Sequence, residues 1–281
     1  MAGGAVAIGA LARLRVLGPL GAVAWRAGGL ELAPADWAAL RFTLVQAALS
    51  AGLSVTLAVP VARALSRRSF PGRRVLITLM GAPFLLPVIV AVMGLLALFG
   101  RNGAVNAGLQ AVGLPAVSVY GLQGVVLAHV FLNLPLATRM ILQGWQAIPA
   151  ERFRLGDSLG FSPTDVARHL ERPMLREVLP GALATVFALC LTSFAVALIL
   201  GGGPRATTLE LAIYQAVRFE FDLAHAAGLA LVQAAIGGAA ALAAWRVAAT
   251  AGFGAGLDRA FPGVAPGGWR RAADAAVLAL A

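Results

Sequence analysis

Long apolar stretches separated by polar segments dominate this chain of 281 residues. A helix needs about 20 predominantly apolar residues to cross a bilayer. The stretches that meet this requirement cover residues 42–64, 75–99, 119–141, 179–200 and 224–245. Each predicts a transmembrane helix with modest tilt, so the expected fold class is all-α integral membrane.

The N-terminal apolar stretch differs from the others because it carries charge. Arg13 and Arg15 lie near its middle, and an arginine costs about 3 kcal/mol at the centre of a transmembrane helix. A helix shifted toward Leu14–Leu30 would let both side chains reach the cytoplasmic surface. It would bring the expected number of transmembrane helices to about six. A signal peptide cleaved near Ala22-Val23-Ala24 is the alternative.

These patterns divide the chain into three parts. Residues 1–35 hold the N-terminal helix, transmembrane or signal-like, and residues 36–250 form a transmembrane domain. Residues 251–281 are expected to be a cytoplasmic linker, ending in the apolar run Ala272–Ala281. That run is far shorter than a membrane crossing, so it fits the start of a further transmembrane helix.

Composition favours a membrane protein and disfavours a nucleic-acid-binding one. Hydrophobic residues make up 60% of the chain and charged residues 12%, with a mean hydropathy of +0.85. Soluble domains carry about 25% charged residues. The net charge of +10 does not indicate nucleic acid, because the arginines flank the apolar stretches, where positive charge orients helices. Cys190 lies inside an apolar stretch and is expected to be a small buried residue rather than a reactive thiol.

Arginine placement predicts the orientation in the membrane. The arginine-rich segments are the loop 63–74, the long polar segment 143–178 and the region after residue 245. Their arginines are Arg63, Arg67, Arg68, Arg73, Arg74, Arg152, Arg154, Arg168, Arg172, Arg176, Arg246, Arg259, Arg270 and Arg271. Because cytoplasmic loops carry the excess of basic residues, the long polar segment is expected on the cytoplasmic side, where ATP is found.

The polar segment 143–178 has the signals of a short helix. Ser158 or Ser162 can cap it, Pro163 suits a first helical turn, and Asp165 favours the positive end of the helix. An amphipathic helix is therefore expected over Thr164–Glu171.

The faces and ends of this helix suggest a surface that transmits motion. Val166 and Leu170 fall on one face, with Arg168 near the other. Gly160 is expected to form a tight bend that a side chain would obstruct, and Pro173 is expected to end the helix and return the chain to the membrane. Such a rigid unit could dock on a partner, or it could be a solvated re-entry loop. The residues leave both readings open.

Polar side chains inside the apolar stretches are few and share helix faces. They are Thr43, Gln46, Ser50, Ser54, His129, Asn133, Thr185, Thr192 and Ser193. Six of them, Gln46, Ser50, His129, Asn133, Thr192 and Ser193, are candidates for lining a translocation path for a polar solute. Contacts between packed helices are the alternative role, because hydroxyls and small residues serve there in membrane proteins.

His129 stands out because an ionisable group inside the membrane indicates function. We expect it to be an interhelical hydrogen-bond partner first and a path residue second. A lone imidazole without neighbouring Asp, Glu, Tyr or Cys is a poor ferric site, so no metal site is expected.

Two other classes of membrane protein fit the sequence less well. A secondary transporter generally places acidic groups near the middle of the membrane, whereas the acidic residues here fall in loops or at the ends of the apolar stretches, apart from Asp274. A membrane enzyme needs converging catalytic groups, and His129, His169 and His225 lie in separate regions. Without any lysine the chain has no phosphate-binding loop of the nucleotide-binding kind.

The spacing of Gly160, Leu170 and Pro173 resembles the EAA loop of bacterial ABC importer permeases, the inner-membrane components of binding-protein-dependent transport. The chain departs from that motif in two places. Arg154-Leu155-Gly156 replaces its acidic-Ala-Ala triplet, and Arg172 replaces its leucine. The resemblance implies a type I ABC importer permease fold with a cytoplasmic coupling helix. The implied ATPase-coupling residues are Arg154, Leu155, Gly156, Gly160, Val166, Leu170 and Pro173.

Further segments resemble the permeases that import thiamine and thiamine pyrophosphate. They are residues 200–215, which read LGGGPRATTLELAIYQ, together with Ala62-Arg63-Ala64-Leu65, Tyr120-Gly121-Leu122-Gln123-Gly124 and Leu127-Ala128-His129-Val130-Phe131. The likeness runs from about Ala35 to Arg271 and matches the first half of a two-half permease. It implies transport of thiamine or its phosphate esters. Ferric iron is the alternative substrate, because iron permeases have a related glycine-rich segment.

The resemblance also implies roles and partners. Gly201, Gly202, Gly203, Pro204 and Glu210 would form an outer gate or meet a periplasmic substrate-binding protein, with a simple hairpin as the alternative. ATP-Mg would be hydrolysed by a cytoplasmic ABC ATPase dimer, so this chain is expected to be neither an enzyme nor a holder of cofactors. A second permease half or subunit and membrane lipid complete the expected partners. The location would be the bacterial inner membrane.

Overall fold

The computed structural model describes residues 18–27, 32–81, 86–203 and 206–248, and every regular element within these ranges is helical. The expected fold class, an all-α membrane fold, is confirmed. The expectations for residues 1–17 and 251–281, and for Pro204, lie outside the described residues. A helix over 18–27 is the described part of the expected N-terminal helix.

The described helices differ greatly in length. The long ones are α2 (Pro34–Arg67), α7 (Leu122–Ala147), α10 (Arg172–Leu191) and α13 (Leu223–Ala248). The short ones are α3 (Arg73–Leu79), α5 (Val88–Phe99), α6 (Ala104–Ala111), α8 (Ala150–Ser158), α9 (Pro163–Val166), α11 (Phe194–Leu200) and α12 (Leu209–Gln215), with π-helical segments η1 (Ala167–Glu171) and η3 (Ala216–Glu220). Within the described ranges, five helical stretches are long and apolar enough to cross a membrane: Pro34–Arg67, Val88–Ala111, Leu122–Ala147, Pro163–Leu191 and Leu223–Arg246.

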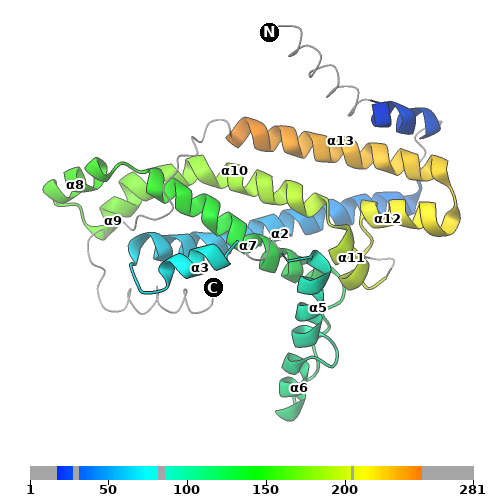
Figure 1. Ribbon diagram of the computed structural model, residues 1–281, viewed down its shortest axis with the longest axis horizontal. Helices are drawn as coiled ribbons and strands as arrows, with labels where there is room; N and C mark the ends of the chain where they lie inside the picture. The colour runs from blue at the N-terminus through cyan, green and yellow to red at the C-terminus, as the bar shows by residue number, and fades with distance from the viewer. Residues whose placement is uncertain (1–17, 28–31, 82–85, 204–205, 249–281) are drawn as a thin grey trace, which may run out of the picture.

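The long helices form the body of the molecule. Helices α2, α10 and α13 run along its long axis, α7 crosses them, and α5 with α6 extends away from the bundle (Figure 1). Apolar clusters join α2, α7 and α10 around Leu65, then α5, α7 and α11 around Val125, and α2, α12 and α13 around Leu229. Helix α2 therefore contacts most of the bundle.

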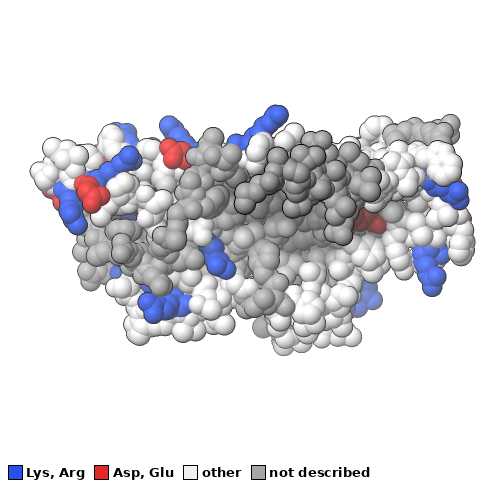
Figure 2. Space-filling model, turned by 45° about the horizontal axis from the view of Figure 1, so that its top comes forward, with Lys and Arg blue, Asp and Glu red and all other residues white. Residues whose placement is uncertain are grey.

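Small residues explain how α2 packs so closely. Its buried face carries Ala47, Ala51, Ala58 and Ala62, each at most 2% exposed. In a membrane, where lipid is as apolar as leucine, helices associate through such close packing rather than through hydrophobic burial. Charged side chains gather at the end that carries α8 and α9 and again at the opposite end (Figure 2).

One predicted transmembrane helix, over residues 75–99, is interrupted, so that prediction is wrong in its continuity. Helix α3 ends at Leu79 and α5 begins only at Val88, with Pro87 at its N-cap. A proline inside a helix removes a hydrogen-bond donor and clashes with the preceding turn, whereas it is tolerated at a helix start. Pro87 therefore marks a helix start.

The predicted helix over residues 179–200 is also divided. Helix α10 begins at Arg172, ends at Leu191, and is followed by α11 at Phe194. Thr192 and Ser193 between them have non-helical backbone, with φ/ψ of −105°/71° and −130°/50°. Side chains from other helices hold this break, as shown below.

Pro173 does not end a helix, which corrects the expectation from the sequence. The chain is helical without interruption from Pro163 to Leu191, and Pro173 lies in the first turn of α10. The wider turn of η1 directly precedes it, and the N–H of Arg172 donates to the carbonyl of Ala167 in the π pattern. A π turn leaves room for the proline ring, which an α turn lacks.

Candidate functional site

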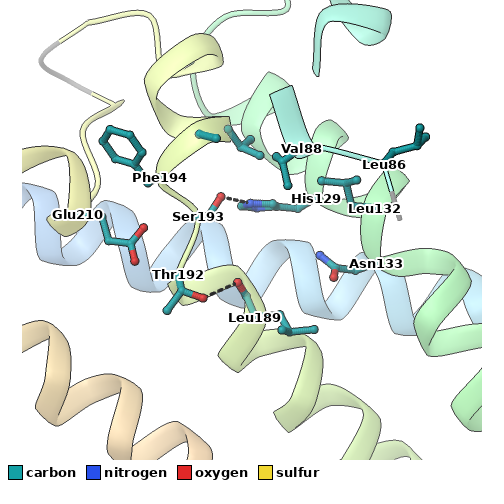
Figure 3. Close-up of a pocket in the computed structure, with 12 residues that line it drawn as sticks. Leu86, Val88, His129, Leu132, Asn133, Leu189, Thr192, Ser193, Phe194 and Glu210 are labelled. Carbon is teal, nitrogen blue, oxygen red and sulfur yellow. Dashed lines mark hydrogen bonds between the residues drawn. The ribbon is translucent and has the colours of Figure 1, made fainter. Parts of the chain in front are cut away.

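A cavity of about 490 Å³ lies where α7, α12 and the break between α10 and α11 meet (Figure 3). The residues that line it are Leu86, Val88, His129, Leu132, Asn133, Leu189, Thr192, Ser193, Phe194, Ala195, Val196 and Glu210. An apolar wall with a few converging polar groups is typical of small-molecule sites of this size. The cavity is therefore a candidate substrate site.

His129 joins two distant helices beside this cavity. Its Nδ1 lies 3.3 Å from the hydroxyl oxygen of Ser50 on α2, and its Nε2 is hydrogen-bonded to the hydroxyl of Ser193. The imidazole is 3% exposed, so both contacts are shielded from solvent. His129 is thus an interhelical hydrogen-bond partner, and it also lines the cavity.

The Glu210 carboxylate lines the cavity beside the helix break at Thr192 and Ser193. Hydrogen bonding from the backbone of Phe194 and Ser193 favours its charged form. Helix α12 lies outside the five candidate spans. Partial burial raises the pKa of the Glu210 carboxyl, and those two backbone hydrogen bonds oppose the shift.

A second set of contacts surrounds the end of α10. The side-chain amide of Asn133 donates to the Sγ of Cys190 at 3.4 Å, and that of Gln46 donates to the Cys190 carbonyl at 2.8 Å. Cys190 is buried, as expected from the sequence. Gln46 and Ser50 are fully buried and do not line the cavity.

The structure therefore divides the path candidates. It brings His129, Asn133, Thr192 and Ser193 together around one cavity and places Gln46 and Ser50 at helix contacts behind it. The sequence predicts Glu210 at an outer gate or at a contact with a periplasmic binding protein, and that role stays a prediction; its side chain lines the cavity. Phe194 also lines the cavity and was not a candidate from the sequence. The one sequence signal for Glu210 was an acidic residue two positions after Thr208, in the first turn of α12, which Thr208 caps through its hydroxyl.

The glycine-rich turn after α11 lies against the start of α7. The N–H of Gly121 donates to the carbonyl of Leu200 at 2.7 Å. Gly202 packs so closely against Tyr120 that a Cβ built on Gly202 would lie 3.0 Å from the Cβ of Tyr120. This contact fixes the turn beside the cavity. Its role at an outer gate stays a prediction.

The segment around α8 and α9 forms a second candidate site. At the end of α8 the N–H of Gly160 donates to the carbonyl of Asp157 at 3.1 Å, and that of Phe161 donates to Gly156 at 2.9 Å. This is the Schellman pattern, in which the residue after the helix is left-handed, and Gly160 has φ +71°. The bend is confirmed at Gly160, but no atom lies within 4 Å of a Cβ built there, so backbone conformation rather than space selects glycine.

Helix α9 starts as the sequence predicts. The Ser162 hydroxyl accepts from the N–H of Asp165 at 3.3 Å, and the Asp165 carboxylate accepts from the N–H of Ser162 at 3.0 Å, which completes a capping box. Hydrogen bonds from the Ser162 side chain and backbone hold the pKa of Asp165 below its usual value. The start of α9 is therefore fixed by a local contact between Ser162 and Asp165, which are three residues apart.

Close packing fixes the angle between α8 and α9. A Cβ on Gly156 would lie 3.0 Å from the ring of Phe161, and that ring lies 5.6 Å from the His169 ring, centroid to centroid. Gly156 is buried at this contact. The absence of a side chain at Gly156 thus lets the Phe161 ring pack closely against α8. The EAA motif has alanine at this position.

The outer surface of this segment is apolar in part. Leu155 on α8 and Leu159 at its C-cap are 60% and 64% exposed. Arg154 and Pro173 are exposed, whereas Val166 and Leu170 are half-buried. The coupling candidates therefore include both surface residues and residues that hold the segment together.

One carboxylate connects the segment to α2. Glu171 in η1 lies 2.6 Å from the Nη2 of Arg67 and 3.0 Å from the Nη2 of Arg63. Its side chain is only 6% exposed. Sequence reasoning missed this link, because the partners are about a hundred residues apart and nothing in their local pattern pairs them.

No protein-family model matches the chain. It is 50% identical to the thiamine transport system permease protein ThiP of Escherichia coli strain K12 over 198 residues, which cover 70% of this chain and 37% of that protein. ThiP of Haemophilus influenzae is 38% identical over 228 residues, covering 80% of this chain and 41% of the relative. The chain thus spans about two fifths of the length of these curated relatives.

Solved structures agree on the fold. A bacterial ABC transporter involved in the import of the acidic polysaccharide alginate superposes with a TM-score of 0.63 at 14% identity, covering 78% of this chain and 81% of that one. The resemblance to bacterial ABC importer permeases is confirmed. The relatives are permease subunits of transporters, and with five apolar helices this chain is a multi-pass membrane protein.

Proposed function

We propose that this chain is a permease component of an ATP-driven importer that carries thiamine or its phosphate esters across the bacterial inner membrane. The observation that carries the proposal is the 50% identity to thiamine transport permeases over 198 residues. Those residues cover most of the chain that the structure describes. The ferric alternative gains no support from these relatives, and no group of three potential metal ligands occurs among the described residues.

The α8–η1 segment supplies the surface for the ATPase in this proposal. Leu155 on α8 and Leu159 at its C-cap expose apolar side chains next to arginines. The arginine distribution predicts that this segment lies in the cytoplasm. An exposed apolar patch with a polar rim is typical of a protein interface. ATP-Mg is bound and hydrolysed in the partner ATPase dimer, and the chain contributes the docking surface.

Movement of that segment reaches the membrane helices by two physical links. The helix is continuous from Pro163 to Leu191, so α10 moves with the docking segment. The Glu171 contacts with Arg63 and Arg67 tie the same segment to α2. Helix α10 ends beside the cavity at Leu191, and α2 contacts the cavity residue His129 through Ser50 in its middle. These contacts connect ATP-driven closure to the substrate site.

Two further partners belong to the proposal. A periplasmic binding protein delivers the substrate, a role supported by a structural neighbour, at TM-score 0.61, that was solved in complex with a pentasaccharide-bound periplasmic protein. A second permease half or subunit completes the path, because the chain covers only 37% of the length of ThiP.

The test is uptake of labelled thiamine by cells that lack their own importer and express this permease with the ATPase and binding protein of its operon. ATP-dependent accumulation, competed by unlabelled thiamine and thiamine pyrophosphate, is the expected result. A complex that assembles but accumulates no thiamine contradicts the substrate, and labelled ferric ion is then tested in the same cells.

A further inference from the structure

The cavity beside the helix break has a distinctive charge. Among the described residues that line it, Glu210 carries the one carboxylate and none is arginine. The carboxylate is half-buried, and at low local dielectric a single charge acts more strongly than it does in water. The cavity is therefore suited to a solute that presents a cationic group to it.

The position of the carboxylate is fixed rather than adaptable. Glu210 lies in the first turn of α12, and the Thr208 hydroxyl caps that turn by accepting from the N–H of Leu211. The start of α12 is in turn fixed to α2, because the N–H of Leu209 donates to the hydroxyl of Thr43 at 2.9 Å. A charge that is preorganised in this way needs little rearrangement to meet a ligand.

Aromatic side chains continue from the cavity to the surface. Phe194 lines the cavity next to Glu210 (Figure 3). Its ring centroid lies 5.2 Å from that of Tyr214, which lies 5.9 Å from that of Phe219. Phe219 is 68% exposed. Faces of aromatic rings attract cations by about 0.5–2 kcal/mol and stack on other rings.

We propose that this cavity selects an organic cation with an aromatic ring, held between the Glu210 carboxylate and the Phe194 ring. Asn133 and Thr192 supply hydrogen-bonding groups on the same cavity wall as His129 and Ser193, and Tyr214 and Phe219 form the aromatic approach. The inference rests on the proposed function, since it names the substrate class of the same importer. Thiamine, a ring cation, belongs to this class.

A purely structural role for Glu210 makes different predictions. As an anchor, it needs only an acceptor for the two N–H groups, and glutamine provides one. As a cation site, it needs the negative charge. Glu210→Gln therefore separates the two roles, and Glu220→Gln is the matched control, because the Glu220 side chain is 59% exposed on the neighbouring η3.

The experiment measures labelled thiamine uptake and ATP hydrolysis by the complete complex in proteoliposomes with saturating loaded binding protein. The expected result is a loss of uptake of at least tenfold in E210Q, with ATP hydrolysis within twofold of wild type and E220Q unchanged. Adding N133D to E210Q places a carboxylate elsewhere on the cavity wall and is expected to recover uptake at least threefold. A structural anchor would not be rescued in that way.

The outcomes separate this inference from the proposed function. No ATP-dependent thiamine uptake by the wild-type complex overturns the proposed function itself. Uptake by the wild type with E210Q equal to E220Q overturns the cation site alone. Failure of E210Q to assemble, or a loss of uptake that N133D does not relieve, also overturns the inference.

Discussion

The docking segment and the cavity are built in opposite ways. In the docking segment, the contacts that set the shape join residues three to eight apart, as in the Ser162–Asp165 capping box and the Gly156, Phe161 and His169 packing. At the cavity, Ser50 meets His129 across 79 positions and His129 meets Ser193 across 64. A local unit can move as one body, whereas a cavity built from distant helices changes shape when those helices move.

This difference suits the two proposed roles. A segment that receives a push from an ATPase must keep its own shape. A substrate site must open and close as helices shift. Changes in the docking segment are therefore expected to abolish coupling, and changes in the cavity to alter substrate handling.

The largest effect is expected at Gly160, where φ is +71°. Gly160→Val forces a β-branched residue into the left-handed region, at a cost of roughly 1–2 kcal/mol or more, and distorts the α8–α9 bend. We expect at least a tenfold loss of thiamine uptake with normal membrane insertion.

Asparagine is the matched control at this position, because it tolerates the left-handed conformation and a Cβ there meets no neighbour. Gly160→Asn is expected to retain at least half of wild-type uptake. Equal loss in both variants would show that the backbone conformation is not what matters.

A somewhat smaller effect is expected at Glu171. Glu171→Gln removes the charge that Arg63 and Arg67 share, and breaking a largely buried ion pair costs about 3 kcal/mol, less here because Arg63 is 39% exposed. We expect a Tm several degrees lower and uptake reduced about fivefold. An unchanged Tm and unchanged uptake would remove the link between η1 and α2 from the account.

A substitution at Leu155 tests the docking surface, because it is expected to change assembly with the ATPase and not the folding of the permease. Leu155→Ser removes an exposed apolar side chain and is expected to weaken co-purification of the ATPase several-fold, with the Tm of the permease unchanged. Leu114 is 53% exposed and lies after α6, so Leu114→Ser is the control and is expected to leave assembly intact. Identical co-purification of both variants would place the interface elsewhere.

The smallest effect concerns the distant contacts that fix α12. Thr43→Val leaves the buried N–H of Leu209 without its acceptor, which costs about 1–2 kcal/mol. Ser54 is equally buried on the same helix, but its hydroxyl has no hydrogen-bond partner, so Ser54→Ala is expected to cost little. Thermal unfolding of the two variants in detergent compares them directly, and a larger drop for Ser54→Ala would contradict the role of Thr43.

The same contrast explains what the sequence could predict. Apolar run length located the long helices, and cap and turn residues located the Gly160 bend and the start of α9, because both signals are local. Pro173 was read wrongly, since the π turn of η1 accommodates its ring. At the division of the 179–200 helix, Ser193 is hydrogen-bonded to His129, which lies outside that stretch, so no pattern within the stretch could show this contact.

Simultaneous measurement of thiamine uptake and ATP hydrolysis in proteoliposomes tests the central claim most directly. The wild-type complex is predicted to show both, Gly160→Val to lose ATP-coupled uptake and the stimulation of hydrolysis by loaded binding protein, and Glu210→Gln to lose uptake while keeping hydrolysis. A wild-type complex that hydrolyses ATP without accumulating thiamine, or two variants with the same pattern of loss, would contradict it.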